Sequence, residues 1–245
     1  MSTAPVNITW LGQSGFLFES HGERLLIDPF YSDIVEQTQG LKRLMQPPVP
    51  IERLNPSAIF ITHNHLDHFD PIALPEIHAL YPSIPIIGPE SVMKKGNELG
   101  FNPSVLKQIE KGETIAIGEF KLTVTAAYHS DPFSVGCLIE AGDKLIYYSG
   151  DTILTDTLFN DVVCLKKRPI DIVFIVINGR LGNMNAEEAI ELTSQLNPKL
   201  AIPMHYGMFA ENTEDPLIFL EGCRQKNIKS IECCVQVISA IFRNK

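Results

Sequence analysis

The sequence predicts a mixed α/β protein in which two β-sheets pack together and helices lie outside them. Short apolar segments with strand character cluster at the start and in the middle of the chain. Helical segments are mixed with these strands, but strand and helix do not alternate regularly. Because 245 residues is the length of about one large domain, we expect a single domain over 1–245.

The first half of the chain is expected to form strands and two helices. Apolar residues flank the turn signal at 12–15, and residues 24–27 add another strand. Residues 57–62 are a continuous apolar run, typical of a strand that is buried on both faces. The other elements expected here are a helix, a strand and a second helix, at residues 71–81, 84–87 and 91–99. Pro75 argues against the first of these helices.

Strand signals dominate the middle of the chain. The four strands expected there lie at residues 114–117, 121–126, 134–140 and 144–148. Residues 185–196 are the clearest helix, because Asn185 can cap its N-terminus and Glu188 stands at the capping-box position. The remaining expected elements are strands at 170–177, 200–204 and 235–242 and a helix at 217–226.

The composition restricts the partners. Lys and Arg number 20 against 29 Asp and Glu, a net charge of −9, so we expect no nucleic-acid partner. No apolar run approaches the roughly 20 residues of a membrane span, so we expect no membrane partner. Five cysteines, an odd number without a CxxC spacing, favour free thiols and a cytoplasmic protein.

A segment rich in histidine and aspartate follows the apolar run 57–62. Within eight residues it holds three of the seven histidines of the chain and two aspartates: His63, His65, Asp67, His68 and Asp70. Imidazole and carboxylate are ligands for zinc, iron and manganese. Because the segment has no cysteine, it does not resemble a structural zinc finger. A metal site is therefore expected at the end of this strand.

Three further ligand-type residues stand in the same context. His129 follows the strand 121–126, Asp151 follows 144–148, and His205 follows 200–204. Sheet proteins with helical layers commonly place their sites at strand ends.

The order His63-x-His65-x-Asp67-His68, then His129, Asp151 and His205, resembles the metallo-β-lactamase superfamily. The resemblance spans at least residues 10–205 and implies a four-layer αββα sandwich, with metals at one edge. It implies a first ion on His63, His65 and His129, and a second ion on Asp67, His68 and His205, with Asp151 as a bridge. Asp28 and Asp70 would orient the metal loop.

Residues 177–189, 203–216 and 10–16 resemble the L-ascorbate-6-phosphate lactonase branch of this superfamily. The resemblance implies a lactonase that carries two divalent ions, Mn²⁺ or Zn²⁺, and assembles as a homo-oligomer. Asp67 and Asp151 are its expected catalytic residues. A small anionic substrate would bind Arg180 by its phosphate, and Asn178 and Tyr206 are further candidate substrate contacts.

Two other functions stay open at this point. The same metals could cleave a phosphodiester or a nucleotide, although the acidic chain disfavours a large nucleic acid. Alternatively, the chain could be a non-catalytic metal sensor, which would require metals without open coordination positions.

Overall fold

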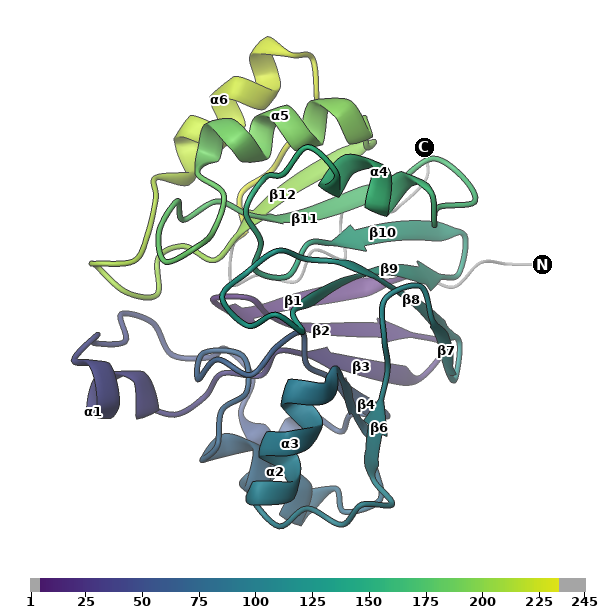
Figure 1. The fold of residues 1–245 in the computed structure, drawn as a ribbon, viewed down its shortest axis with the longest axis vertical. Coiled ribbons are helices and arrows are strands. Elements are labelled where there is room, and N and C mark those ends of the chain that lie inside the picture. The colour runs from purple at the N-terminus through teal and green to yellow at the C-terminus, as the bar shows by residue number, and fades with distance from the viewer. Residues whose placement is uncertain (1–4, 234–245) are drawn as a thin grey trace.

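A computed structural model describes residues 5–233. Two six-stranded sheets pack against each other, and helices cover their outer faces (Figure 1), as the sequence predicts. The N-terminal sheet follows chain order: β1 (Asn7–Gly12), β2 (Gly15–Ser20), β3 (Glu23–Ile27), β4 (Ala58–Phe60), β5 (Ile86–Gly88) and β6 (Leu106–Gln108). The C-terminal sheet has the order β12-β11-β10-β9-β8-β7. Its strands are β7 (Thr114–Ile117), β8 (Phe120–Ala126), β9 (Val135–Ala141), β10 (Lys144–Tyr148), β11 (Ile172–Val176) and β12 (Leu200–Met204).

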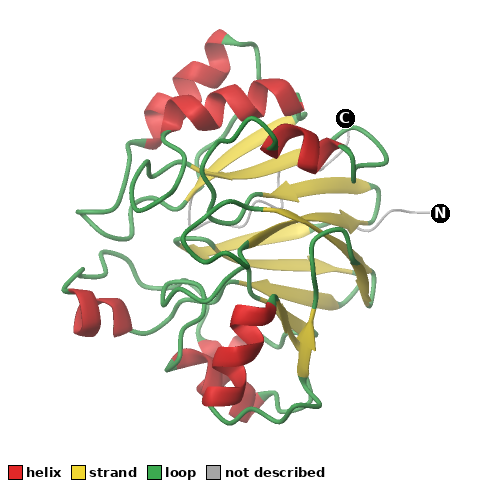
Figure 2. Cartoon of the chain, viewed as in Figure 1, coloured by secondary structure: helices red, strands yellow, loops and turns green. Residues whose placement is uncertain are grey.

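Five helices form the outer layers (Figure 2): α2 (Ala73–Leu80), α3 (Glu90–Glu98), α4 (Leu158–Val163), α5 (Ala186–Leu196) and α6 (Pro216–Gln225). Helix α1 (Ile34–Gln39) stands at the edge of the sheets (Figure 1), and residues Ile51–Arg53 form a 3₁₀ turn. The cap predicted for α5 is confirmed, because the Asn185 side chain accepts from the backbone N–H of Glu188 and the Glu188 carboxylate accepts from that of Asn185. Helix α2 tolerates Pro75, since this residue stands in the first turn, where backbone N–H groups have no intrahelical partner.

Alternation along the strands of the N-terminal sheet builds two separate cores. Phe16, Phe18 and Phe60 face the C-terminal sheet and join the core between the sheets. Leu17 and Ile59 face the other way and pack under α2 and α3. Because successive side chains of a strand point to opposite faces, alternate residues enter the core between the sheets and the core under the outer helices.

The strand directions bring several loops to one edge. Strands β3, β4 and β5 run parallel, as do β10, β11 and β12. Strand β8 runs in the same direction as β10, because each is antiparallel to β9. The loops after β4, β8, β10, β11 and β12 thus leave the carboxyl ends of their strands, where ligand sites of open α/β sheets lie.

Some expectations differ from the structure or fall outside it. The short elements α1, α4 and β6 are additions to those predicted. The predicted strand 235–242 lies outside the described residues. Among the described residues, Cys137, Cys164 and Cys223 are free thiols, as predicted. In the same part of the chain, no helix combines the length and the apolar character that crossing a membrane requires.

Candidate metal centre

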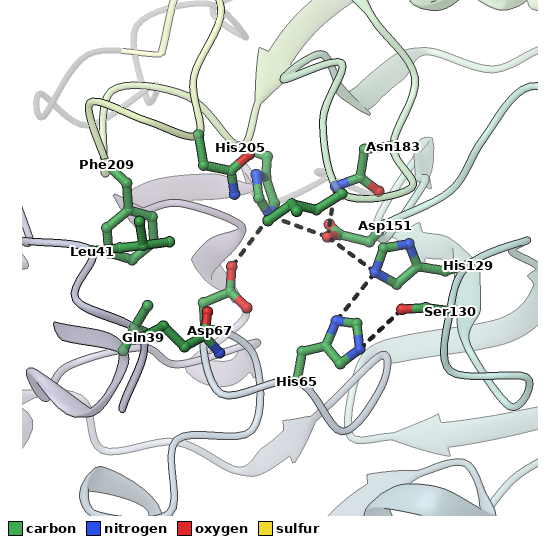
Figure 3. Close-up of a pocket in the computed structure, with 13 residues that line it drawn as sticks. Gln39, Leu41, His65, Asp67, His129, Ser130, Asp151, Asn183, His205 and Phe209 are labelled. Atoms are coloured by element: carbon green, nitrogen blue, oxygen red, sulfur yellow. Dashed lines mark hydrogen bonds and ion pairs between the residues drawn. The ribbon is translucent and has the colours of Figure 1, made fainter. Parts of the chain in front are cut away.

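The structure gathers the seven candidate ligands at this edge of the sandwich. The loop after β4 supplies four of them, and the loops after β8, β10 and β12 supply one each: His63, His65, Asp67, His68, His129, Asp151 and His205. Figure 3 shows His65, Asp67, His129, Asp151 and His205 converging on one cavity. Both sheets therefore contribute to the same site.

These residues form overlapping groups whose candidate donor atoms lie within 4.8 Å of one another. One group is His63, His65 and His129; another is Asp67, His68 and His205. Asp151 stands between them, since its Oδ2 lies 3.8 Å from His129 Nε2 and 3.1 Å from His205 Nε2. A third group, His63, His68 and Asp151, shares residues with both.

Buried atoms without hydrogen-bond partners test whether these residues fit a metal. Nε2 of His63 is buried and has no hydrogen-bond partner. Nε2 of His68 and Oδ1 of Asp151 are also buried and make no hydrogen bond, although they lie 3.4 Å apart. A buried polar atom without a partner costs about 1–3 kcal/mol, which a bound cation would offset. Nitrogen and carboxylate oxygen donors suit zinc, manganese or iron. The donor set therefore fits divalent cations.

Asp28 orients His68 and the start of the metal loop. Its Oδ2 lies 2.9 Å from His68 Nδ1 and accepts from the hydroxyl of Thr62 at 2.8 Å. Its Oδ1 accepts from the backbone N–H of Thr62 at 2.8 Å. Because a carboxylate can only accept, Nδ1 of His68 carries the proton and Nε2 faces the cluster. Asp28 thus fixes the His68 ring and the backbone of Thr62 in place.

Asp70 holds the end of the same loop through hydrogen bonds to the backbone. Its carboxylate accepts from the backbone N–H groups of Tyr31 and Ser32 at 2.9 and 2.7 Å, and from that of Ala73 at 3.0 Å. Asp70 therefore joins the start of α2 to the segment that follows β3.

The electrostatics separate the neutral from the charged imidazoles. Burial lowers the pKa of His63 well below 6.5, and the neighbouring His68 lowers it further. Burial also acts to lower the pKa of His205, but the carboxylates of Asp151 and Asp67 outweigh it and raise this pKa to about 9. Asp151 titrates well below its ordinary pKa, since His205 and His68 overcome the effect of its burial.

A cavity of about 300 Å³ opens onto the candidate ligands. The predicted substrate residues do not line it. Arg180 is exposed. Asn178 is buried and donates to Asn212 Oδ1 at 2.7 Å. The Tyr206 ring stacks on Trp10, and its hydroxyl donates to the carbonyl of Cys233. The structure therefore gives Asn178 and Tyr206 packing roles, and a substrate contact by any of the three stays a prediction.

Sequence reasoning missed two residues that hold the site's carboxylates. The fully buried Gln13 donates from Nε2 to Asp67 Oδ2 at 2.8 Å. Asn183 donates to Asp151 Oδ2 at 2.8 Å and lines the cavity. The φ of Gln13 is 52°, which is unusual for a residue other than glycine. The turn signal at residues 12–15 marks this position in the sequence, but it does not indicate the contact with Asp67.

Known proteins resemble the chain over most of its length. The family model of the β-lactamase superfamily domain matches residues 7–205. A UPF0173 metal-dependent hydrolase of Deinococcus radiodurans is 32% identical over 229 residues, covering 90% of this chain and 93% of the relative. A second, of Methanosarcina mazei, is 30% identical over 236 residues, with coverages of 91% and 93%. A metallo hydrolase from Ignicoccus hospitalis has the same fold, with a TM-score of 0.74 and 21% identity over 95% of this chain and 97% of that one.

Fold, clustered His and Asp side chains and family match together define a metal-dependent hydrolase of the metallo-β-lactamase superfamily. Within this superfamily, the chain belongs to the UPF0173 metal-dependent hydrolases.

Proposed function

We propose that this hydrolase opens lactones and that two divalent ions, Mn²⁺ or Zn²⁺, occupy the site. The observation that carries the proposal is the composition of the cavity wall. Among the described residues that line it, the charged side chains are all candidate ligands, and none is Lys or Arg. The carbonyl of a cyclic ester is neutral, so such a substrate needs no cationic side chain beside the ions.

Each candidate ligand has a function in this proposal. Divalent ions held here would supply hydroxide from water at neutral pH and withdraw charge from the carbonyl oxygen. His63, His65 and His129 would hold the first ion, and Asp67, His68 and His205 the second, with Asp151 between them. The carboxylate of Asp67 lines the cavity, and Gln13 fixes its Oδ2. Asp67 is thus placed to take the proton that the attacking water loses and to pass it to the alkoxide oxygen that leaves when the ring opens.

The test is hydrolysis of lactones by protein loaded with Mn²⁺ or Zn²⁺. L-Ascorbate 6-phosphate is the first substrate, since the sequence resemblance points to it, and uncharged γ-lactones are the second. His65→Ala removes a candidate ligand, and His21→Ala changes an exposed histidine outside the site. We expect His21→Ala to keep turnover and His65→Ala to lose it.

The competing functions give different results in the same assay. Cleavage of bis(p-nitrophenyl) phosphate without cleavage of any lactone would replace the proposal by a phosphodiesterase. A protein that binds two ions but cleaves neither class would support the metal sensor. The outcome thus separates the three functions that the sequence left open.

A further inference from the structure

We propose that the cavity takes an uncharged cyclic ester whose short aliphatic side chain packs on an apolar wall. This inference rests on the proposed function and names its substrate class. The wall consists of Val35, Leu41, Leu181 and Phe209, and it accompanies the candidate ligands around the cavity. Figure 3 shows Leu41 and Phe209 on one side of the cavity and His65, His129 and Ser130 on the other.

A phosphorylated substrate lacks a partner in this cavity. Its polar lining residues outside the candidate ligands are neutral: Gln39, Ser130, Asn183 and Asn212. The amide of Asn183 already donates to Asp151, and the amide oxygen of Asn212 already accepts from Asn178. A buried phosphate needs charge-assisted hydrogen bonds to offset its desolvation, and these side chains do not supply them.

The apolar wall stands on a segment that is firmly anchored. Residues 30–45, which we call the arm, carry Val35 and Leu41. The buried guanidinium of Arg43 donates to the carbonyls of Phe30 and Ser32 at 3.2 and 2.8 Å and lies over the Phe30 ring at 4.0 Å. Val35 and Phe209 belong to one buried cluster, and Leu41 packs against it. The wall is thus a preformed surface, as in most small-molecule sites.

Leu181 gives independent support for an apolar ligand. Its side chain is 70% exposed although it lines the cavity, and its φ of 52° is unfavourable for leucine. Leu181 directly precedes Gly182, whose carbonyl accepts from Nδ1 of His129 at 2.8 Å. The turn that carries Leu181 is closed by a hydrogen bond from the backbone N–H of Asn183 to the carbonyl of Arg180 at 3.2 Å, and it leaves the Leu181 side chain uncovered. A ligand that covers this side chain would explain its exposure.

The size of the cavity limits the side chain of the substrate. A volume of about 300 Å³ equals that of about ten water molecules in the liquid, and so about ten non-hydrogen atoms. A γ-lactone ring with its carbonyl oxygen has six, which leaves about four carbons for the side chain. γ-Octalactone, with a butyl side chain, fits this limit.

The experiment measures kcat/KM for γ-lactones with methyl to hexyl side chains, on metal-loaded protein. We expect a gain of about fourfold per methylene up to butyl and none beyond it. L-Ascorbate 6-phosphate should be at least about tenfold worse than γ-octalactone. Calorimetry with the corresponding γ-lactams, which keep ring and side chain but resist hydrolysis, measures binding alone and should give the same gain per methylene.

Variants locate the effect on the wall. Leu41→Ala should reduce the gain to about twofold per methylene, whereas Leu44→Ala, on the same arm with a 57% exposed side chain, should leave it unchanged. Leu181→Ala changes an exposed side chain, so it keeps the test valid if Leu41→Ala does not fold.

The outcomes separate the two proposals. Hydrolysis of every lactone at similar kcat/KM, or a preference for L-ascorbate 6-phosphate, would overturn the apolar wall and leave the lactonase in place. Lactam binding that strengthens with chain length, without hydrolysis of any lactone, would overturn the lactonase and support the wall. A side-chain dependence that Leu41→Ala and Leu181→Ala both leave unchanged would also overturn the wall.

Discussion

Asp28 offers a direct test of how the site is built. Its Oδ1 accepts from the backbone N–H of Thr62, and its Oδ2 accepts from the hydroxyl of Thr62 and from Nδ1 of His68. The hydroxyl of Tyr148 lies 3.1 Å from Oδ2 and donates to the carbonyl of Ser14 at 2.6 Å. In Asp28→Asn, either orientation of the amide turns its NH₂ group toward a donor. A buried group left without a partner costs about 1–3 kcal/mol, and the remaining bonds lose their charge assistance. We therefore expect the free energy of unfolding of the metal-free protein to fall by about 3 kcal/mol.

Metal binding by the same variant should weaken more selectively. Without the carboxylate, the His68 ring loses the acceptor that fixes its proton on Nδ1, and such losses weaken metal binding by about 10- to 100-fold. Urea unfolding of chelator-treated protein gives the stability, and competition with a chromophoric chelator gives the affinity for Zn²⁺. Asp143→Asn, at an exposed position, should change unfolding by less than about 0.5 kcal/mol. Wild-type metal affinity in Asp28→Asn would refute the reasoning.

Three further predictions follow from the described contacts. Gln13→Leu removes the amide donor to Asp67, so kcat should fall about tenfold in a steady-state assay; unchanged kcat would show that Asp67 needs no such support. Leu181→Gly relieves a positive φ, so thermal unfolding should show a gain of up to about 1 kcal/mol together with lower kcat/KM for aliphatic lactones; a loss of stability would contradict the strain. Burial acts to lower the pKa of His205, but the carboxylates of Asp151 and Asp67 raise it to about 9, so this ring is protonated without metal at pH 7. Metal binding at pH 7 should therefore release about one proton from His205 and strengthen as the pH rises toward 9, which calorimetry in buffers of different ionisation enthalpy measures; the absence of proton release would argue against this ligand.

The sequence predicts which strands end at the site better than it predicts which residues line the cavity. The apolar run 57–62 indicates a buried strand, and the histidines after it indicate a ligand-bearing loop. Both can be predicted because apolar character and ligand type are properties of the local sequence. Arg180 stands in a loop that reaches the cavity, yet its side chain is exposed while that of the next residue, Leu181, lines the cavity. The positive φ values at residues 179, 181 and 182 determine where the side chains of this loop point. Hydrophobic periodicity in the sequence does not predict such values.

Other features depend on contacts between distant segments. Gln13 is a turn residue by sequence, and it becomes part of the site because packing of the two sheets brings its amide to Asp67, 54 residues later. The short helix α1 has six residues and one buried side chain, Val35, too few for a helical period. Its place on the cavity follows from the anchoring of the arm by Arg43, which tertiary structure alone reveals.

The division of the ligands between the two sheets has a consequence for how the protein matures. During synthesis, the N-terminal half emerges first with His63, His65, Asp67 and His68, whereas His129, Asp151 and His205 follow only with the C-terminal sheet. Neither half by itself holds a complete donor set in the three groups that the structure brings together. A metal held by any of these groups would therefore bind only after the halves have docked, and it would cross-link parts of the chain that are translated far apart in time.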